Sequence, residues 1–143
     1  MALDFLSPLH KASRQISVYL EDHTRELGVS LVEGHVLTYL ASYSPTPIGD
    51  LVRIFGIKQS TFTSMIDRLE TAGLLRREIN REDRRSFLIQ ITDQGRDLAE
   101  RLNRVLKSLE EQIRGRLTAQ EVEGFRAVMG AVEEITRVRL RAE

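Results

Sequence analysis

The spacing of apolar residues predicts two short helices on either side of Gly56. Apolar residues recur at helical spacing from Ile48 to Phe55 and again from Ile57 to Leu69. A glycine between two amphipathic helices permits the left-handed backbone turn that lets them cross at a steep angle. The pattern therefore predicts a helix-turn-helix, a motif whose second helix can lie in the major groove of DNA.

Beyond the second of these helices, the apolar period changes from helical to two. Leu75, Arg77 and Ile79 share one face, and the run at 87–91 alternates in the same way on the return. A polar loop at 80–85 separates the two runs. This pattern predicts a β-hairpin with one apolar face and a charged tip.

Residues typical of helix ends divide the rest of the chain into longer helices. The expected helix starts are Ser7-Pro8, the capping box of Ser30 and Glu33, Thr92, and the capping box of Thr118 and Glu121. The expected helix ends include Gly28, Ser42 and Gly73. The segment at 44–47 contains two prolines and is expected to be a loop, in which Thr46 and Pro47 start the next helix.

The first helix and the last two carry apolar stripes that the compact middle segment is too small to cover. These stripes include Leu6 and Leu9 near the N-terminus, and Leu117, Val122 and Phe125 near the C-terminus. One interpretation is an intramolecular helix bundle. We favour the other, a homodimer interface built from both ends of the chain.

Length, charge and cysteine content narrow the class of protein. The chain has 143 residues, with 21 basic and 21 acidic side chains and a formal net charge of zero. DNA-binding proteins are often basic overall, but salt screens each charge beyond about 10 Å, so the local distribution matters more than the sum. The absence of cysteine excludes disulfides and thiolate metal sites, and no run approaches the roughly 20 apolar residues of a membrane span. A soluble cytoplasmic protein is expected.

Several short motifs stand at a joint spacing in the middle of the chain. They are Asp67-Arg68-Leu69-Glu70, Gly73-Leu74, Asp83-Arg84-Arg85-Ser86, and Ile91-Thr92 followed by Gly95. This set resembles the D-R-L-E…G-L…D-R-R-S…L-T-x-x-G signature of the multiple antibiotic resistance regulator (MarR) family, and the similarity covers nearly the whole chain.

The resemblance implies a mainly α fold (α+β), a winged helix-turn-helix with long N- and C-terminal dimerisation helices. It places one domain at 1–143, the DNA-binding lobe at 30–95, and the dimerisation helices at 1–28 and 96–143. Family members are homodimers that bind palindromic operators in double-stranded DNA, commonly as repressors released by small, often phenolic, anions. The implied partners are therefore duplex DNA, a second copy of the chain and a small aromatic acid as effector, with no cofactor or metal.

Polar residues of the second helix of the motif, the recognition helix, are the candidate DNA contacts. They are Lys58, Gln59, Ser60, Thr61, Thr63, Ser64 and Arg68. Short polar side chains suit base edges and phosphate oxygens, and a helix N-terminus attracts phosphate. The alternative is an ordinary solvated helix face. Lys58 stands where the family often has a capping serine, and Ser64 where many members have arginine, so the family's sequence preference is not carried over.

The tip of the hairpin, or wing, holds further candidates. Arg81 and Arg84 are expected to contact DNA, and Arg84 resembles the arginine that enters the minor groove. Arg85 resembles the structural arginine that pairs with the aspartate of the recognition helix, here Asp67. Asp83 is expected to brace the loop by accepting hydrogen bonds from backbone N–H groups.

A candidate ligand site combines polar and aromatic residues of the first two helices. They are His10, Arg14 and Tyr19 in the first helix, with His35, Tyr39 and Tyr43 at spacings of four in the second. An apolar pocket with a few such groups suits a phenol or a carboxylate. The alternative is that these residues pack in the core or in the dimer interface.

The sequence argues against an enzyme. The three histidines do not form an H-E-x-x-H motif, and no glycine-rich phosphate loop or nucleophile elbow is present. A DNA-binding transcriptional regulator is therefore the leading hypothesis. The alternative is a winged-helix module that binds proteins without specific DNA readout, which the zero net charge and the absence of arginine at Ser64 favour. The charged wing and polar recognition helix favour the regulator.

Overall fold

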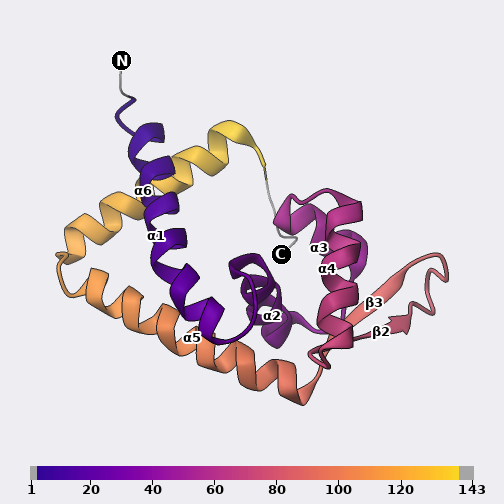
Figure 1. Cartoon of the computed structure of the whole chain (residues 1–143). Helices are drawn as coiled ribbons and strands as arrows, with labels where there is room; N and C mark the ends of the chain where they lie inside the picture. Colours follow the sequence, from indigo (N-terminus) through magenta and orange to yellow (C-terminus); the bar gives the residue numbers. More distant parts are fainter. Residues whose placement is uncertain (1–2, 139–143) are drawn as a thin grey trace.

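The computed structural model describes residues 3–138, and within that range the chain forms six helices and three short strands (Figure 1). They are α1 (Leu6–Glu26), α2 (Leu31–Tyr43), β1 (Thr46–Pro47), α3 (Ile48–Phe55), α4 (Gln59–Thr71), β2 (Leu75–Ile79), β3 (Phe87–Ile91), α5 (Asp93–Arg114) and α6 (Ala119–Thr136). This is the predicted mainly α winged helix-turn-helix fold. The outermost parts of the predicted dimerisation segments, residues 1–2 and 139–143, lie outside the described residues.

Three helices begin at the caps that the sequence predicts. The Ser30 hydroxyl accepts from the Glu33 N–H while the Glu33 carboxylate accepts from the Ser30 N–H, and Thr118 forms the same reciprocal pair with Glu121. The Thr92 side chain accepts from the backbone N–H of Gly95 at the start of α5. Each cap satisfies an N–H group that the helix cannot pair internally.

The expected cap of the first helix is wrong. The helix begins one residue before Ser7, and the Ser7 hydroxyl accepts a hydrogen bond at 3.1 Å from the N–H of Leu3, outside the helix. Pro8 is still inside the first turn, where its missing N–H removes no helical hydrogen bond.

The predicted loop at 44–47 contains a strand. Thr46 and Pro47 form β1, which pairs antiparallel with β3 and completes a sheet of order β1-β3-β2. Ser44 extends this connection because its hydroxyl accepts from the Ile91 N–H at 3.0 Å. The start of α3 is thereby attached to the wing sheet.

The two strands of the hairpin present the predicted residues on one face. Leu75 lies opposite Ile91, Arg77 opposite Ile89, and Ile79 opposite Phe87, so these residues share one face of the sheet. At the base of the hairpin Leu75, Ile89 and Ile91 are buried, whereas Ile79 and Phe87 near the tip are exposed.

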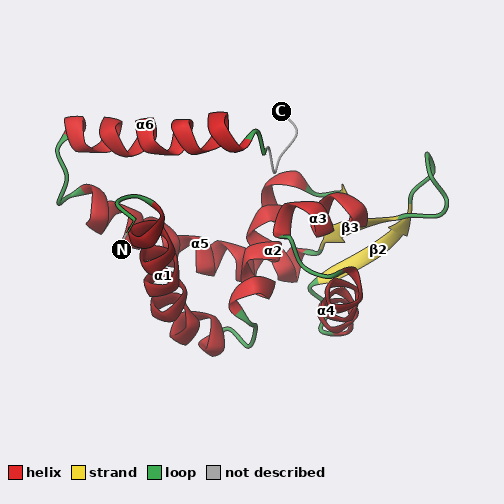
Figure 2. Ribbon diagram, turned by 90° about the horizontal axis from the view of Figure 1, so that it is seen from above, coloured by secondary structure: helices red, strands yellow, loops and turns green. Residues whose placement is uncertain are grey.

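The hydrophobic core lies between α2, the helix-turn-helix and the base of the wing (Figure 2). Leu37 and Leu40 of α2 pack in it with Leu51 of α3, and Phe62 and Ile66 supply the buried face of α4. These side chains are fully enclosed, so the orientation of the recognition helix is fixed by apolar packing.

The terminal helices project from this core. None of the described residues of α6 is buried, and Figure 2 shows this helix turning back from the end of α5 and lying apart from the other helices. Leu6 in α1, Ile113 in α5, and Phe125 and Ile135 in α6 are exposed apolar residues of this part of the chain. Within residues 3–138, no helix is long and apolar enough to cross a membrane.

Candidate nucleic-acid interface

The recognition helix α4 begins without a side-chain cap. Gly56 adopts φ 62° and ends α3, and Lys58 is the N-cap residue of α4 but makes no capping hydrogen bond. A lysine ammonium has no acceptor for backbone N–H groups. The first N–H groups of α4 therefore remain available to an anion, with the positive end of the helix dipole behind them.

The two faces of α4 differ as the sequence predicts. Phe62, Met65, Ile66 and Leu69 are buried, whereas the predicted DNA contacts Lys58, Gln59, Ser60, Thr61, Ser64 and Arg68 are exposed and Thr63 is half-buried. The exposed face carries hydroxyl, amide and guanidinium groups side by side. It has the width and polarity of a surface that can enter a groove.

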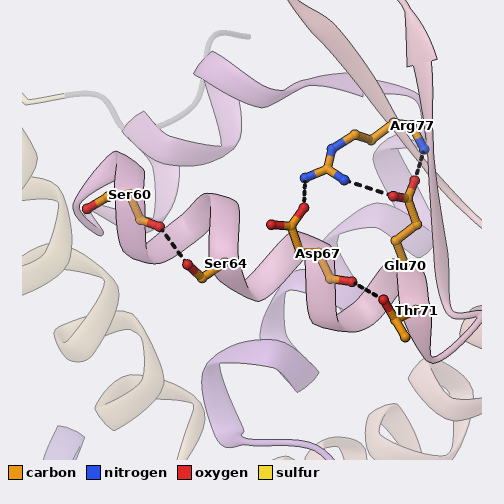
Figure 3. Close-up of polar contacts among 6 residues, drawn as sticks. All are labelled: Ser60, Ser64, Asp67, Glu70, Thr71 and Arg77. Carbon is orange, nitrogen blue, oxygen red and sulfur yellow. Dashed lines mark hydrogen bonds and ion pairs between the residues drawn. The ribbon is translucent and has the colours of Figure 1, made fainter.

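Two exposed hydroxyls on this face are hydrogen-bonded to their own helix. The Ser64 hydroxyl donates to the Ser60 carbonyl at 3.1 Å, and the Thr71 hydroxyl donates to the Asp67 carbonyl at 2.9 Å (Figure 3). Each hydroxyl has a single hydrogen, so both side chains retain only their acceptor lone pairs.

Arg77 of β2 joins the wing to the recognition helix. Its guanidinium donates to Asp67 through Nη2 and to Glu70 through Nη1, the latter at 2.8 Å, and its backbone N–H donates to Glu70 at 2.9 Å (Figure 3). Burial lowers the pKa of Arg77, but the hydrogen bonds and charges of Asp67 and Glu70 outweigh burial, so the net pKa is raised. The arginine is therefore permanently charged and holds two elements together.

This arrangement corrects the predicted partner of Asp67. The sequence assigned Arg85 to that role, but Arg85 pairs with Asp83 in its own loop at 3.2 Å and is exposed. Arg77 is nearer because it stands on the strand directly behind α4, whereas Arg85 lies in the tip beyond it. Sequence reasoning missed Arg77, although an arginine on the otherwise apolar face of the hairpin was the signal.

The wing tip is charged and exposed. Arg81, Arg84 and Arg85 all lie on the surface, and Asp83 accepts from the Arg85 N–H at 3.1 Å, which confirms its predicted bracing of the loop. Asn80 contributes in the same way by accepting from the Glu82 N–H. Short-range hydrogen bonds thus shape the loop and leave the Arg84 side chain without a partner among the described residues.

Arg68 is tied to the start of α2. Its Nε donates to Glu33 at 3.0 Å, and the Glu33 side chain is 7% exposed. Burial raises the pKa of Glu33, but the hydrogen bonds from Arg68 and from Ser30 together lower it below its ordinary value. Glu33, which the sequence identified only as a helix cap, also connects α2 to the recognition helix.

A groove of about 370 Å³ separates the start of α4 from the wing. Its lining includes Gln59 and Thr63 of the recognition helix and Arg85, Ser86 and Phe87 of the wing. Hydrogen-bond donors from both elements thus face one depression. Its size and lining suit a polar, anionic strand lying between helix and wing.

The segment that contains this surface matches a known family. The model of the MarR family matches residues 29–87, from the turn before α2 to the first residue of β3. Over this segment the chain is similar to the MarR family.

Relatives and solved structures agree with this similarity. The HTH-type transcriptional regulator PecS of Dickeya dadantii (strain 3937) is 39% identical over 94 residues, which are 66% of this chain and 56% of PecS. The chain therefore spans a little over half the length of that relative. S. aureus MepR in DNA-binding conformation has a TM-score of 0.84 at 18% identity, covering 94% of this chain and 99% of MepR. A mutant MarR from E. coli complexed with operator DNA has a TM-score of 0.75 at 22% identity, covering 87% and 89%.

The structure does not bring all the candidate ligand residues together. On α1, His10 is exposed, Arg14 pairs with Glu21 at 3.4 Å, and Tyr19 contacts His23, so these side chains interact along their own helix. The amino-terminal half of α1 extends beyond α2 (Figure 1).

Two of the three candidates on α2 are in contact with each other. Tyr39 contacts Tyr43 with ring centroids 4.7 Å apart and meets the edge of Phe55 at 5.9 Å. His35 is half-buried, and burial lowers its pKa. The ligand site stays a prediction.

Proposed function

We propose that this protein is a transcriptional regulator that binds double-stranded DNA sequence-specifically, with α4 in the major groove and the wing in the adjacent minor groove. The proposal rests on the contacts of Arg77 with Asp67 and Glu70, which we call the Arg77 clamp. This clamp fixes the exposed polar face of α4 and the arginine-bearing wing in one geometry. A surface that must meet two grooves at once needs such a fixed relation. The solved relatives named above include one in a DNA-binding conformation and one with operator DNA.

Charge distribution supports the proposal despite the zero net charge. Lys58 at the uncapped start of α4 and Arg81 and Arg84 in the wing are exposed on the elements that face DNA. Asp67 and Glu70 would repel phosphate, but Arg77 pairs with both and offsets one of their two negative charges. Phosphate contacts then position the protein, while base contacts determine the sequence.

The protein acts as a homodimer on a palindromic operator in this proposal. Exposed apolar residues of α1, the end of α5 and α6 supply the contact surface, because α6 buries none of its described residues within one chain. A two-fold dimer places two recognition helices about one helical turn, or roughly 10 bp, apart. The operator is therefore an inverted repeat.

Repression and release by an effector complete the proposal. A small aromatic acid binds near His35 and Tyr39 and favours a dimer whose two lobes no longer match the groove spacing. Such a ligand must bind the two forms with different affinity, because equal affinity shifts no equilibrium. The half-buried imidazole of His35 and the contact between Tyr39 and Tyr43 on the same helix support this location. Calorimetry with salicylate, on the wild type and on His35→Ala and Tyr39→Phe, tests it, and unchanged binding in both variants places the pocket elsewhere.

The alternative is a protein-binding winged-helix module, which the zero net charge and the serine at position 64 favour. Selection of bound sequences from random duplexes separates the two functions. The regulator is expected to yield an inverted-repeat consensus, and retention on random duplex DNA is expected to fall steeply with salt as counterions are released. Failure to enrich any sequence, together with salt-independent retention, contradicts DNA recognition.

A further inference from the structure

Four polar residues of α4 form a stripe along its exposed side. Ser60, Ser64, Asp67 and Thr71 follow one another at spacings of four, three and four, which places them on one side of a helix. Ser64 stands in the second turn from the N-terminus, the part of a recognition helix that reaches base edges.

The hydrogen of the Ser64 hydroxyl is already used. It forms the 3.1 Å bond to the Ser60 carbonyl (Figure 3), and the oxygen of this exposed side chain keeps its two lone pairs as acceptors. Phosphate oxygens only accept hydrogen bonds, so Ser64 would have to break its bond to Ser60 in order to donate to one. A partner that donates fits the side chain as it stands.

Asp67, one turn further along, adds a second acceptor to the stripe. One carboxylate oxygen is bound by Arg77, and the other has no hydrogen-bond partner among residues 3–138. The guanidinium of Arg77, which also pairs with Glu70, offsets part of this negative charge and so reduces its repulsion of the phosphates beside the groove. The middle of the stripe therefore attracts hydrogen-bond donors.

The cation of α4 itself is directed away from this stripe. Arg68 follows Asp67, but its Nε is bound to the buried carboxylate of Glu33, which draws the guanidinium toward α2. Guanine is usually read by an arginine that donates to its O6 and N7. The middle of α4 places no guanidinium beside Ser64 for that contact.

We propose, on the basis of the function proposed above, that Ser64 accepts a hydrogen bond from an exocyclic amino group in the major groove, either N4 of cytosine or N6 of adenine. Only these two bases present a donor there, because guanine shows N7 and O6 and thymine shows O4 and a methyl group. Ser64 thus selects an amino-bearing base at one position of each half-site and rejects guanine and thymine on that strand.

Selection from random duplexes, performed with wild type and Ser64→Ala, locates this position. Alanine is the best helix former and Ser64 is exposed, so the variant is expected to fold. Thr71→Ala is the matched control, because it removes a hydroxyl with the same bond to a carbonyl four residues earlier, at the far end of α4. Preference at one position is expected to relax in Ser64→Ala only, and the preferred base there is cytosine or adenine.

Base analogues without the amino group then identify the donor. At the located position, cytosine is replaced by pyrimidin-2-one, or adenine by unsubstituted purine. The replacement is expected to weaken wild-type and Thr71→Ala binding by about 5- to 150-fold and to leave Ser64→Ala binding nearly unchanged. The analogue that weakens binding shows whether Ser64 reads cytosine or adenine.

Other results overturn the inference. A preferred guanine or thymine at the located position, or no relaxed position at all, contradicts it while a clear consensus leaves DNA recognition intact. Equal weakening of Ser64→Ala on every sequence places the hydroxyl on phosphate. Absence of any consensus with the wild type contradicts the proposed function itself.

Discussion

At the scale of single residues, Arg77 has the largest effect on the interface because it is the only described residue that binds both acidic groups of α4. Its side chain is 20% exposed while that of Asp67 is 61% exposed, so water still screens the pair. The pair is expected to add under about 1 kcal/mol to the stability of the fold. Arg77 matters chiefly because it fixes the position of the wing relative to α4.

The Arg77 clamp predicts which substitutions interact in DNA binding. Asp67→Ala and Arg77→Ala are expected to be non-additive, since either one breaks the same contact. Asp67→Ala and Arg85→Ala are expected to add, because Arg85 pairs with Asp83 instead. A double-mutant cycle of operator affinity measures both. Strong coupling between Asp67 and Arg85 would restore the assignment that the family resemblance implied.

The exposed Arg84 predicts a direct contact. Arg84→Ala is expected to cost about 1–3 kcal/mol of operator binding while leaving the melting temperature unchanged. Glu82→Ala at the same tip is the control and is expected to strengthen binding slightly, because it removes a charge that repels phosphate. Affinity measured at several salt concentrations tests this, and an Arg84→Ala variant that binds normally would exclude the wing tip from the interface.

Burial of His35 predicts a loss of stability in acid. Its pKa is lowered in the folded chain, so below about pH 6.5 the unfolded chain takes up a proton that the folded chain resists. The free energy of unfolding is therefore expected to fall as the pH drops through that range, and less so in His35→Gln. Chemical denaturation at pH 7.5 and 5.5 gives the comparison. The lowered pKa of Glu33 also makes stability fall with falling pH, but at lower pH, below the ordinary glutamate pKa of 4.5.

At the scale of elements, Gly95 sets how closely α5 approaches the base of the wing. A Cβ on Gly95 would lie 2.2 Å from the Leu74 carbonyl oxygen and 2.8 Å from Ile91 Cγ1. Gly95→Ala is thus expected to destabilise the fold by about 1–3 kcal/mol, because backbone must move. Gly49→Ala, in α3 with no atom within 4 Å, is expected to be neutral or slightly stabilising. Urea denaturation compares them, and equal stability of the two variants would contradict this account.

The elements most accurately predicted from sequence are those defined by local signals. The caps at Ser30 and Thr118 involve residues three apart, and the alternation of the hairpin gave the correct facing residues. Strand β1 was missed because its partner Ile89 is more than forty positions away and two prolines indicate a loop. Local patterns contain no information on such a pairing.

The candidate site was predictable to the same extent. The exposed side of α4 follows from the apolar period, because burying Phe62 and Ile66 leaves the other face to solvent. The partners of Asp67 and Arg68 did not follow, since both contacts join elements that meet only in the folded chain. The resemblance to the family named an arginine for Asp67 but chose the wrong one.

At the scale of the whole molecule, the exposed apolar residues of the chain ends predict self-association. Phe125 is 58% exposed on α6, and Phe125→Asp is expected to break the dimer because an interface would have to bury an unpaired charge. Light scattering is expected to give twice the 16.4 kDa mass of one chain for the wild type, and the mass of one chain for the variant. Gln120→Asp adds the same charge at the start of α6 and is expected to remain dimeric. A monomeric wild type at micromolar concentration would contradict the proposal.

The isolation of α6 has a consequence for how the regulator responds to its own abundance. An 18-residue helix without buried contacts is only marginally stable in water. It gains most of its stability when a second copy covers it, so folding of this segment and pairing of two chains become one event. At low expression, the amount of operator-competent protein would then rise with the square of gene dosage. Occupancy of the promoter would switch on over a narrower range of protein level than a monomeric binder allows.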